Sequence, residues 1–155
     1  MSEGASSSAT CVECVKGKWC DQEGADVPSK CIECVEGTSN PNDGGSAKEA
    51  CVLCKAGTYQ DTKGSAMCKP CPTGRFLGEL GATNVDSCSL CGTGTYNPSE
   101  GSVSDSDCVV CPRGTYNPNE GAGSEGNCVG CPAGKMGNST GLKSEQCTFT
   151  FASLV

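Results

Sequence analysis

Cysteine is the residue type in this sequence with the greatest capacity for chemistry. The chain has 16 cysteines among 155 residues and no histidine. Most of the cysteines fall in C-x-x-C doublets, which begin at Cys11, Cys31, Cys51, Cys68, Cys88, Cys108 and Cys128. Doublets start twenty residues apart, except for one seventeen-residue step from Cys51 to Cys68. Cysteines at this spacing could form disulfides, bind zinc or act as redox pairs.

Disulfide bonding is the first interpretation. More than a tenth of the residues are cysteine, which is typical of a disulfide scaffold in an oxidising compartment. If the second cysteine of each doublet bonds the first of the next, every cysteine has a local partner. The predicted bonds are Cys11–Cys20, Cys14–Cys31, Cys34–Cys51, Cys54–Cys68, Cys71–Cys88, Cys91–Cys108, Cys111–Cys128 and Cys131–Cys147. Bonds within each doublet are the alternative, and they would leave Cys20 and Cys147 to meet across the whole array.

Zinc binding is the second interpretation, because C-x2-C-x16-C-x2-C falls within the spacing of zinc-ribbon ligands. Seven doublets do not divide into whole four-cysteine sites, so a fourth site would need Cys20, Cys147 and a leftover doublet to converge. Redox C-x-x-C chemistry fits less well, since no βαβ pattern surrounds a doublet. We therefore expect disulfides, with no structural metal and no cofactor.

Few other residues form a recognisable site. Asn138-Ser139-Thr140 is the one N-x-S/T sequon without proline, and we expect glycosylation of Asn138 in a loop. Asp105 and Asp107 lack an EF-hand pattern around them, so a solvated turn is expected there rather than a calcium site. Without histidine there is no His-based triad, and no serine lies in a nucleophile-elbow sequence. We expect no catalytic residues, and hence that the protein is not an enzyme.

A repeat of about 20 residues must position the cysteines. Counted from the second cysteine of each doublet, glycine recurs at plus three and at plus ten in all seven copies. The residue at plus five is Trp19, Ser39, Tyr59, Phe76, Tyr96, Tyr116 or Met136. Such a period predicts a stacked, elongated array in which each unit touches mainly its neighbours. The glycines are expected to adopt positive φ, and the large residue at plus five to pack over each disulfide.

The composition excludes a large apolar core. Only seven residues are Phe, Trp or Tyr, against 22 Gly, so burial alone cannot offset the entropy of ordering the chain. Cross-links must substitute for a core. The predicted fold class is small and disulfide-rich: an elongated tandem array of cysteine-rich modules of about 20 residues, with short β-ribbons and turns and little helix.

Charge and hydropathy limit the partners and the location. The formal net charge is −7, and the 11 basic residues are dispersed, so nucleic acid is not expected as a partner. No apolar run reaches the eighteen residues of a transmembrane segment, and residues 1–10 lack the apolar core of a signal peptide. We expect an extracellular or cell-surface protein whose signal has been removed, or a segment of a longer secreted protein.

Five segments follow from these patterns. They are a flexible lead-in at 1–10, an irregular first module at 11–34, a regular array at 34–131, a closing module at 131–147 and an apolar strand at 148–155. The last segment, TFTFASLV, has no charged side chain, and its start alternates as a strand does. We expect Phe149, Phe151, Leu154 and Val155 to contact a neighbouring copy by strand addition. A strand that folds back to cap its own final module is the alternative.

The string C-x2-C-P-x-G-T-Y, complete from Cys108 to Tyr116, resembles the cysteine-rich repeats called ephrin-receptor-like. It is also similar to the repeats of tumour necrosis factor receptors and of protist surface proteins. The match is partial at other doublets, since Lys55 and Gly92 stand where the family has proline. The resemblance covers roughly residues 11–147 and implies an extracellular rod of disulfide-bonded modules without catalytic residues. The likeness to tumour necrosis factor receptors favours bonds from the second cysteine of one doublet to the first of the next.

We therefore expect a non-catalytic extracellular structural protein that forms part of a surface coat or a self-assembling filament. Expected partners are other copies of the chain, joined head to tail, or other extracellular proteins, with glycans as further candidates. A ligand-binding receptor segment is the alternative. It would need a distinctive insertion or apolar patch in one module, and the near-uniform array with polar loops favours the structural class. A zinc-binding C-x-x-C protein is the second alternative.

Overall fold

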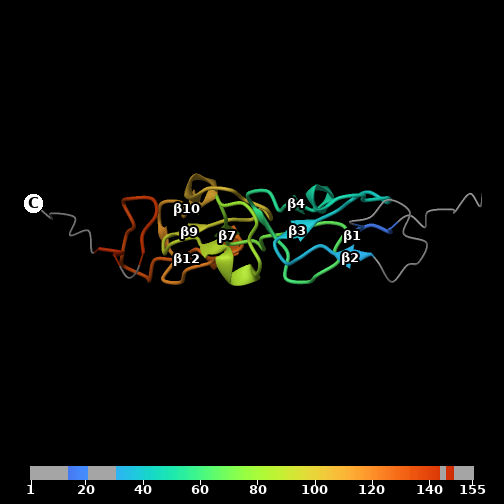
Figure 1. Ribbon diagram of the computed structural model, residues 1–155. Coiled ribbons are helices and arrows are strands. Elements are labelled where there is room, and N and C mark those ends of the chain that lie inside the picture. Colours follow the sequence, from blue (N-terminus) through green and yellow to red (C-terminus); the bar gives the residue numbers. More distant parts are fainter. Residues whose placement is uncertain (1–13, 21–30, 144–145, 149–155) are drawn as a thin grey trace, which may run out of the picture.

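The protein is an elongated rod in which the described chain runs from β1 near one end to the closing module (residues 131–147) at the other (Figure 1). The computed structural model describes residues 14–20, 31–143 and 146–148. Within these ranges the regular structure consists of two-residue strands and three-residue 3-10 helices, without an α-helix. The predicted fold class, a disulfide-rich tandem array of short ribbons and turns, is confirmed.

The strands pair as antiparallel two-stranded ribbons. The pairs are β1 (Lys18–Trp19) with β2 (Ile32–Glu33), β3 (Thr38–Ser39) with β4 (Val52–Leu53), β5 (Thr58–Tyr59) with β6 (Lys69–Pro70), β7 (Arg75–Phe76) with β8 (Ser89–Leu90), β9 (Thr95–Tyr96) with β10 (Val109–Val110), and β11 (Thr115–Tyr116) with β12 (Val129–Gly130). The first strand of each ribbon is the plus-four and plus-five pair, and the second is the pair of residues inside the next doublet. Each ribbon therefore joins one module to the next.

A 3-10 helix precedes the first cysteine of most described doublets. These helices are η2 (Lys48–Ala50), η3 (Val85–Ser87), η4 (Asp105–Asp107) and η5 (Glu125–Asn127). Short polar side chains cap η3 and η4: the Asn84 carboxamide accepts a hydrogen bond from the Ser87 amide, and Ser104 and Asp107 form a capping box. The module from Cys54 to Cys68 has no such helix, because its disulfide-closed loop is three residues shorter at this place. We call it the short module.

Four backbone hydrogen bonds hold each module to the next. At the junction between the 91–108 and 111–128 modules, the Gly94 amide donates to the Asn117 carbonyl at 2.8 Å and the Cys111 amide to the Gly94 carbonyl at 2.9 Å. The Gly121 amide donates to Cys91 at 2.8 Å, and the Asn97 amide to Ala122 at 2.8 Å. The same four bonds recur at every described junction, including both junctions of the short module. The modules therefore form a regular stack rather than a series of independently oriented units.

Contact also reaches beyond the neighbouring module. Gly94 has a φ of +78°, and a Cβ built on it would overlap the carbonyl oxygen of Gly141, two modules further along. The equivalent close pairs are Gly17 with Gly64, Gly37 with Gly81, Gly57 with Gly101, and Gly74 with Gly121. The expectation that each unit touches mainly its neighbours is therefore incomplete. Glycine is needed at plus three both for its positive φ and for this close approach.

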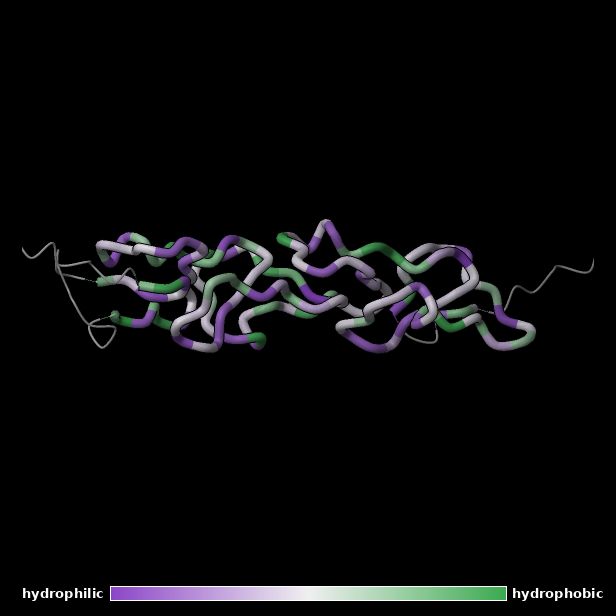
Figure 2. Tube along the Cα trace, turned by 90° about the vertical axis from the view of Figure 1, so that its right-hand side faces the viewer, coloured by the Kyte–Doolittle hydropathy of each residue, from purple (hydrophilic) through white to green (hydrophobic). Residues whose placement is uncertain are grey.

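The centre of the rod is a column of residues at plus six. Asn40, Gln60, Leu77, Asn97 and Asn117 are each at most 4 % exposed and lie among buried cysteines. The plus-five residues before them are only half-buried where they are aromatic, because adjacent residues of a strand face opposite sides. Tyr59 does pack on the Cys71–Cys88 disulfide of the following module, as the sequence predicts for its position. Apolar and polar segments alternate along the whole trace (Figure 2), which fits a thin core without an apolar interior.

The buried amides of this column are hydrogen-bonded. The Asn117 Nδ2 group donates to the Thr95 carbonyl of the preceding module at 2.8 Å, and its Oδ1 accepts from the Asn119 amide at 3.0 Å. In the part of the chain that the structure describes, no buried side-chain nitrogen or oxygen lacks a partner. Satisfied polar groups of this kind fix the register of a core, so the asparagines set how successive modules stack.

Candidate functional site

Seven disulfides form a ladder along the rod. They are Cys14–Cys31, Cys34–Cys51, Cys54–Cys68, Cys71–Cys88, Cys91–Cys108, Cys111–Cys128 and Cys131–Cys147. The order is second cysteine to next first cysteine, and neither bonds within doublets nor paired four-cysteine sites occur among these residues. Cα–Cα separations of 5.5–5.9 Å fall in the usual range for disulfides. The eighth predicted bond involves Cys11, which lies outside the described residues.

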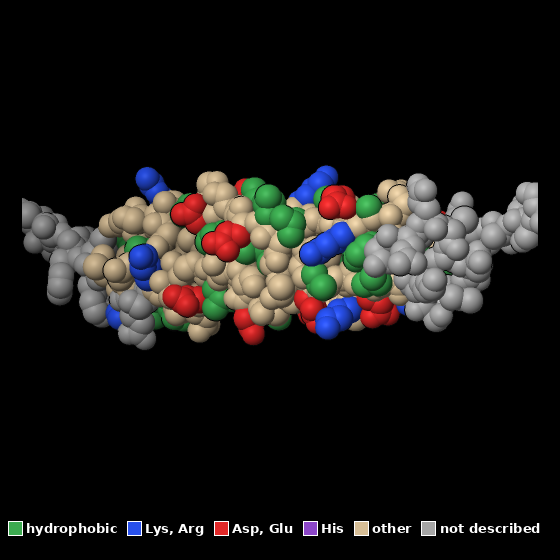
Figure 3. Space-filling view, in the orientation of Figure 1, with side chains coloured by type: hydrophobic (Ala, Val, Ile, Leu, Met, Phe, Trp, Pro, Cys, Tyr) green, Lys and Arg blue, Asp and Glu red, His purple; other side chains and the backbone are tan. Residues whose placement is uncertain are grey.

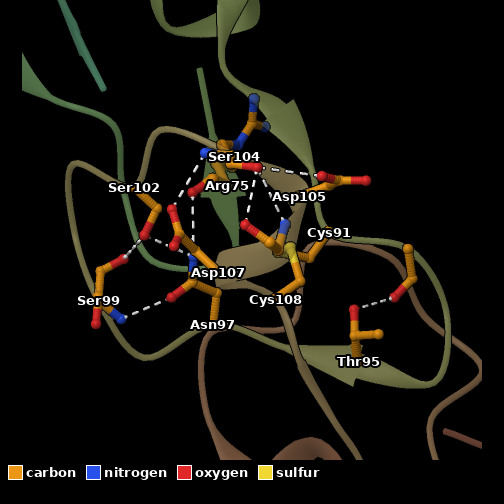
Figure 4. Close-up of a disulfide and its surroundings, with 12 residues drawn as sticks. Arg75, Cys91, Thr95, Asn97, Ser99, Ser102, Ser104, Asp105, Asp107 and Cys108 are labelled. Atoms are coloured by element: carbon orange, nitrogen blue, oxygen red, sulfur yellow. Dashed lines mark hydrogen bonds between the residues drawn. A yellow bond between two sulfur atoms is a disulfide. The ribbon is translucent and has the colours of Figure 1, made fainter. Parts of the chain in front are cut away.

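Each disulfide closes one module and is shielded by it. Figure 4 shows the Cys91–Cys108 bond with the buried Asn97 side chain beside it. Asn97 Nδ2 donates to Ser102 Oγ at 2.8 Å, and Asn97 Oδ1 accepts from the Ser99 amide at 3.0 Å. A closed loop of this size contributes about 3 kcal/mol in the chain-entropy account of disulfides. The ladder therefore supplies much of the stabilisation that the small core cannot.

Asp105 and Asp107, singled out in the sequence, belong to the cap of η4 in this same module. The Asp107 carboxylate accepts from the Val103 amide at 2.9 Å and from the Ser104 amide at 3.1 Å, while Asp105 Oδ1 accepts from Ser104 Oγ at 3.2 Å (Figure 4). Both residues are exposed. Among the described residues no group of three His, Cys, Asp or Glu side chains is arranged to hold a metal ion.

Charged side chains lie on the surface, and one face shows basic, acidic and apolar groups interspersed (Figure 3). Asp61 and Lys69 form an exposed ion pair in the short module. The hydrogen bond from Lys69, followed by one from Thr62, lowers the pKa of Asp61, and the bond to Asp61 raises the pKa of Lys69. Because the pair is open to solvent, it is a surface salt bridge of small energetic weight.

The short module carries an apolar hollow of about 370 Å³. It is lined by Val52 and Leu53 of β4, by Met67, by Pro41 and by the Cys54–Cys68 disulfide, together with Ser39 and neighbouring residues. Met67 is 74 % exposed, and Val52 and Leu53 are each 56 % exposed. Of the described residues that line the hollow, Lys55 alone is charged.

Two departures from the repeat meet in this hollow. The first is Ser39, which stands at plus five where five other modules have an aromatic residue. The second is the missing 3-10 helix, so that Ala66 and Met67 lead directly into Cys68. The two lie together, since the Cys68 Sγ is 3.4 Å from Ser39 Oγ and Ser39 pairs with Val52. The first departure replaces an aromatic ring and the second removes a helical turn, and both lie beside the Cys54–Cys68 disulfide.

The corresponding hollow of a regular module has a mixed lining, in which Leu90 and Val110 lie among polar and charged groups. Beside the Cys91–Cys108 module it is lined by Phe76 in place of Ser39, and by Asp105 from η4. The module two further along adds Thr140, Gly141 and Lys143. The hollow of the short module is therefore more apolar than that of the 91–108 module, and the expected near-uniform array with polar loops does not describe this place.

The remaining predicted site residues have different outcomes. Asn138 is exposed in the closing module, where a glycan would have room. Phe149, Phe151, Leu154 and Val155 lie outside the described residues. Just before them, Thr148 pairs with Met136 through two backbone hydrogen bonds of 2.9 and 3.1 Å, so the chain folds back on the closing module at this residue. No helix within the described ranges is long and apolar enough to cross a bilayer.

In the sequence, Ser39 and the seventeen-residue step appear as two unrelated departures from the repeat, and the hollow that they form together is not predicted from either one. The signal was available, because the ribbon register that brings Ser39 beside β4 is the same in every module. The proximity of Ser39 to the shortened loop can be inferred only when each plus-five residue is aligned with the doublet that follows it.

Comparison with known proteins gives one family. The sequence pattern of the family described as "Tyrosine-protein kinase ephrin type A/B receptor-like" matches twice, at residues 44–88 and 102–147, which together are more than half of the chain. The first match contains the short module and the second contains a regular one. A search of curated proteins finds no match.

Proposed function

The chain belongs to the ephrin-receptor-like family of cysteine-rich repeats, and from that premise we propose that it is a non-catalytic structural rod of the cell exterior, part of a surface coat or of a self-assembling filament. The observation that carries the proposal is the identical set of four backbone hydrogen bonds at every described junction. Such a stack transmits its geometry from one end to the other and is suited to hold a fixed length.

An extracellular location is supported by the ladder. Seven disulfides in one small chain persist in oxidising surroundings and are reduced in the cytosol. The family itself supports the same location, since it takes its description from a receptor.

The absence of catalysis is supported by how the reactive side chains are used. Fourteen cysteines are bonded in the ladder, and the aspartates of η4 serve as caps. The groups whose pKa is clearly shifted are an exposed ion pair rather than members of a cleft. Perturbed groups at functional sites are usually desolvated.

Self-assembly is supported by the asymmetry of the chain. Residues 148–155 combine two phenylalanines, a leucine and a valine without a charge, at one end of a rod whose exposed side chains elsewhere are mixed. A contact between this segment and a different surface of the next copy is heterologous, and its repetition builds a filament when the rotation between copies does not close a ring. Strand addition offers a mode for it.

The test is the oligomeric state of the oxidised chain over a wide concentration range. We expect sedimentation velocity to show concentration-dependent growth and negative-stain microscopy to show linear polymers. Deletion of residues 149–155 should leave a monomer with all its disulfides, as checked by intact mass. A full-length chain that stays monomeric at high concentration contradicts the proposal, and so does a truncated chain that still polymerises.

A ligand-binding receptor segment is the second candidate, and the apolar hollow of the short module favours it. A receptor segment should present one module that differs from the rest and exposes apolar surface, as this module does. The two functions separate in one measurement: a soluble monomer that binds a single foreign protein at nanomolar affinity supports the receptor, whereas growth of the chain alone supports the filament.

A further inference from the structure

We propose that the apolar hollow of the short module receives residues 149–155 of a second copy of the chain. The inference rests on the proposed self-assembly and names the surface that accepts the terminal segment. It places Phe149 or Phe151 against Val52, Leu53 and Met67.

The hollow lies beside the one described plus-five position of the array, up to the closing module, that lacks an aromatic side chain. At plus five the chain has Trp19, Tyr59, Phe76, Tyr96 and Tyr116, but Ser39 lies beside the Cys54–Cys68 disulfide. Phe76 shows what the position holds otherwise, since it lines the equivalent hollow of the 91–108 module. An aromatic ring supplied from outside could occupy the volume that a plus-five aromatic occupies elsewhere.

The lining of the hollow suits an uncharged apolar segment. Val52, Leu53 and Met67 are more than half exposed, so an inserted ring would remove apolar surface from water on both partners. Methionine adapts its shape to an aromatic neighbour and gains from sulfur–ring contact. In the regular hollow the carboxylate of Asp105 would be desolvated by such a ring, which restricts the fit to the short module.

The terminal segment is the part of this chain that matches. Two of its three phenylalanines, Phe149 and Phe151, fall there, and the third is Phe76 of the array. Residues two apart project to the same side of an extended chain, so both rings can face one surface. The segment has no charged side chain, and Lys55 is the single charge in the lining, so insertion buries no opposed or like-charged pair.

A second copy fits the geometry better than the chain's own end. Thr148 is bonded to Met136 in the closing module, whereas the hollow lies between residues 39 and 68, in the other half of the rod (Figure 1). Three complete modules separate the two places. Seven residues span at most about 25 Å when fully extended. Insertion from a second copy would stagger successive rods, and the assembly would keep a free segment at one end and a free hollow at the other.

The experiment maps where the segment lands. In the full-length oxidised protein, Phe151 is replaced by the photoreactive analogue benzoylphenylalanine, and this copy is mixed with isotopically labelled wild-type chains and irradiated. We expect a cross-link from position 151 to the peptide of the labelled copy that contains Leu53 or Met67. Mass spectrometry distinguishes links between copies from links within one copy.

Two variants of the labelled copy sharpen the result. Ser39→Tyr fills the hollow with the residue type that the same position carries in three other modules, and should lower the cross-link yield roughly tenfold or more, as expected for loss of a central contact. Ser89→Tyr is the control, because Ser89, like Ser39, lies on a two-residue strand but is outside both hollows. It should leave the yield unchanged. Intact mass verifies that both variants keep their disulfides.

The outcomes separate this inference from the proposed function. If polymers form but position 151 cross-links elsewhere, the filament stands and the hollow is not its acceptor. The same holds if a foreign protein or a small apolar molecule occupies the hollow, since the cross-link then misses Met67. A link within one copy also overturns the inference. If no polymer and no link between copies form, both proposals fail.

Discussion

The short module and the 91–108 module share the backbone contacts that build the rod and differ in the side chains and loops that they expose to solvent. Both make the same four hydrogen bonds at each of their junctions, and both have a plus-three glycine pressed against a carbonyl two modules further along. They differ in the three residues before the first cysteine of the next doublet, which form η4 in one and are missing in the other. Some positions of the repeat therefore hold the modules together, whereas others can change the exposed surface without altering the hydrogen bonds between modules.

The plus-six residue shows how the short module accommodates the missing helix. In the 111–128 module, Asn117 Nδ2 reaches back to the Thr95 carbonyl of the preceding module. In the short module Gln60 stands at this position, and its Nε2 donates to the Met67 carbonyl of its own loop at 2.6 Å. The extra methylene of glutamine lets the amide satisfy a carbonyl of the shortened loop. The length of the plus-six side chain thus matches the length of the loop. This match indicates that the short module is a specific structural feature rather than a defect in the repeat.

The largest expected effect tests whether the junctions of the two modules are equivalent. Gly57→Ala and Gly94→Ala should each destabilise the adjoining junction by about 3 kcal/mol or more, because a Cβ at positive φ also overlaps a backbone carbonyl. Gly114→Ala is the control. It has a φ of +82° but nothing within 4 Å of its Cβ position, so about 1–2 kcal/mol is expected. Hydrogen exchange of the Cys71 and Cys111 amides, which donate to Gly57 and Gly94, reports the two junctions. If the Cys71 amide of Gly57→Ala or the Cys111 amide of Gly94→Ala still exchanged slowly, the two junctions would not depend equally on the plus-three glycine.

A second effect tests the match between side chain and loop at plus six. Gln60→Asn should cost about 1–3 kcal/mol, because the shortened side chain leaves its own buried amide group without the Met67 carbonyl as a partner. Asn97→Gln in the regular module should cost a similar amount through overpacking of a fully buried site. Thermal unfolding of the oxidised variants measures both. If Gln60→Asn melts like the wild type, the glutamine is not fitted to the loop.

A third, smaller effect concerns the plus-five position. Phe76→Ser should open the regular hollow and lower stability by about 1–2 kcal/mol, since a half-buried ring is lost. Ser39→Tyr should fill the other hollow and change stability by less than about 1 kcal/mol in either direction, because nothing in the lining need move. Melting temperatures of both variants decide the point. A strongly destabilised Ser39→Tyr chain would show that the hollow is smaller than described.

The smallest effect belongs to the ion pair that the short module carries beside its hollow. The pKa of Asp61 lies below its ordinary value of 3.8, so the pair's contribution is fully present above that pH and is lost as pH falls through the lowered pKa. The pKa of Lys69 is raised above 10.5, so the contribution is lost again as pH rises through it. NMR titration of Asp61 should show the low pKa, and Lys69→Met should return it toward 3.8. A titration that does not respond to Lys69→Met contradicts the pairing.

Much of this architecture could be predicted from the sequence, because residues that recur at the same position in every module indicate which backbone conformations and bonds the fold requires. All thirteen positive-φ glycines found in the described residues are those at plus three and plus ten, and the order of the seven bonds follows from parity and resemblance. The buried column could not be predicted, since its members Asn40, Gln60 and Leu77 share no residue type and an Asn-Pro pair is typical of an exposed turn. The contact between Gly94 and Gly141 depends on how the rod winds, which a one-dimensional period does not specify.

The closed loops of the ladder also determine how the rod responds to tension. A force applied between Cys14 and Cys147 travels through each disulfide and then through the two residues between doublet cysteines, bypassing the loop of each module. Each repeat can therefore lengthen only to the 5.5–5.9 Å across the bond plus about 10 Å of backbone. With the bonds reduced, the same repeat of twenty residues could be drawn out to about 66 Å. The oxidised protein is a tether of nearly fixed maximum length, and reducing conditions turn it into an extensible one.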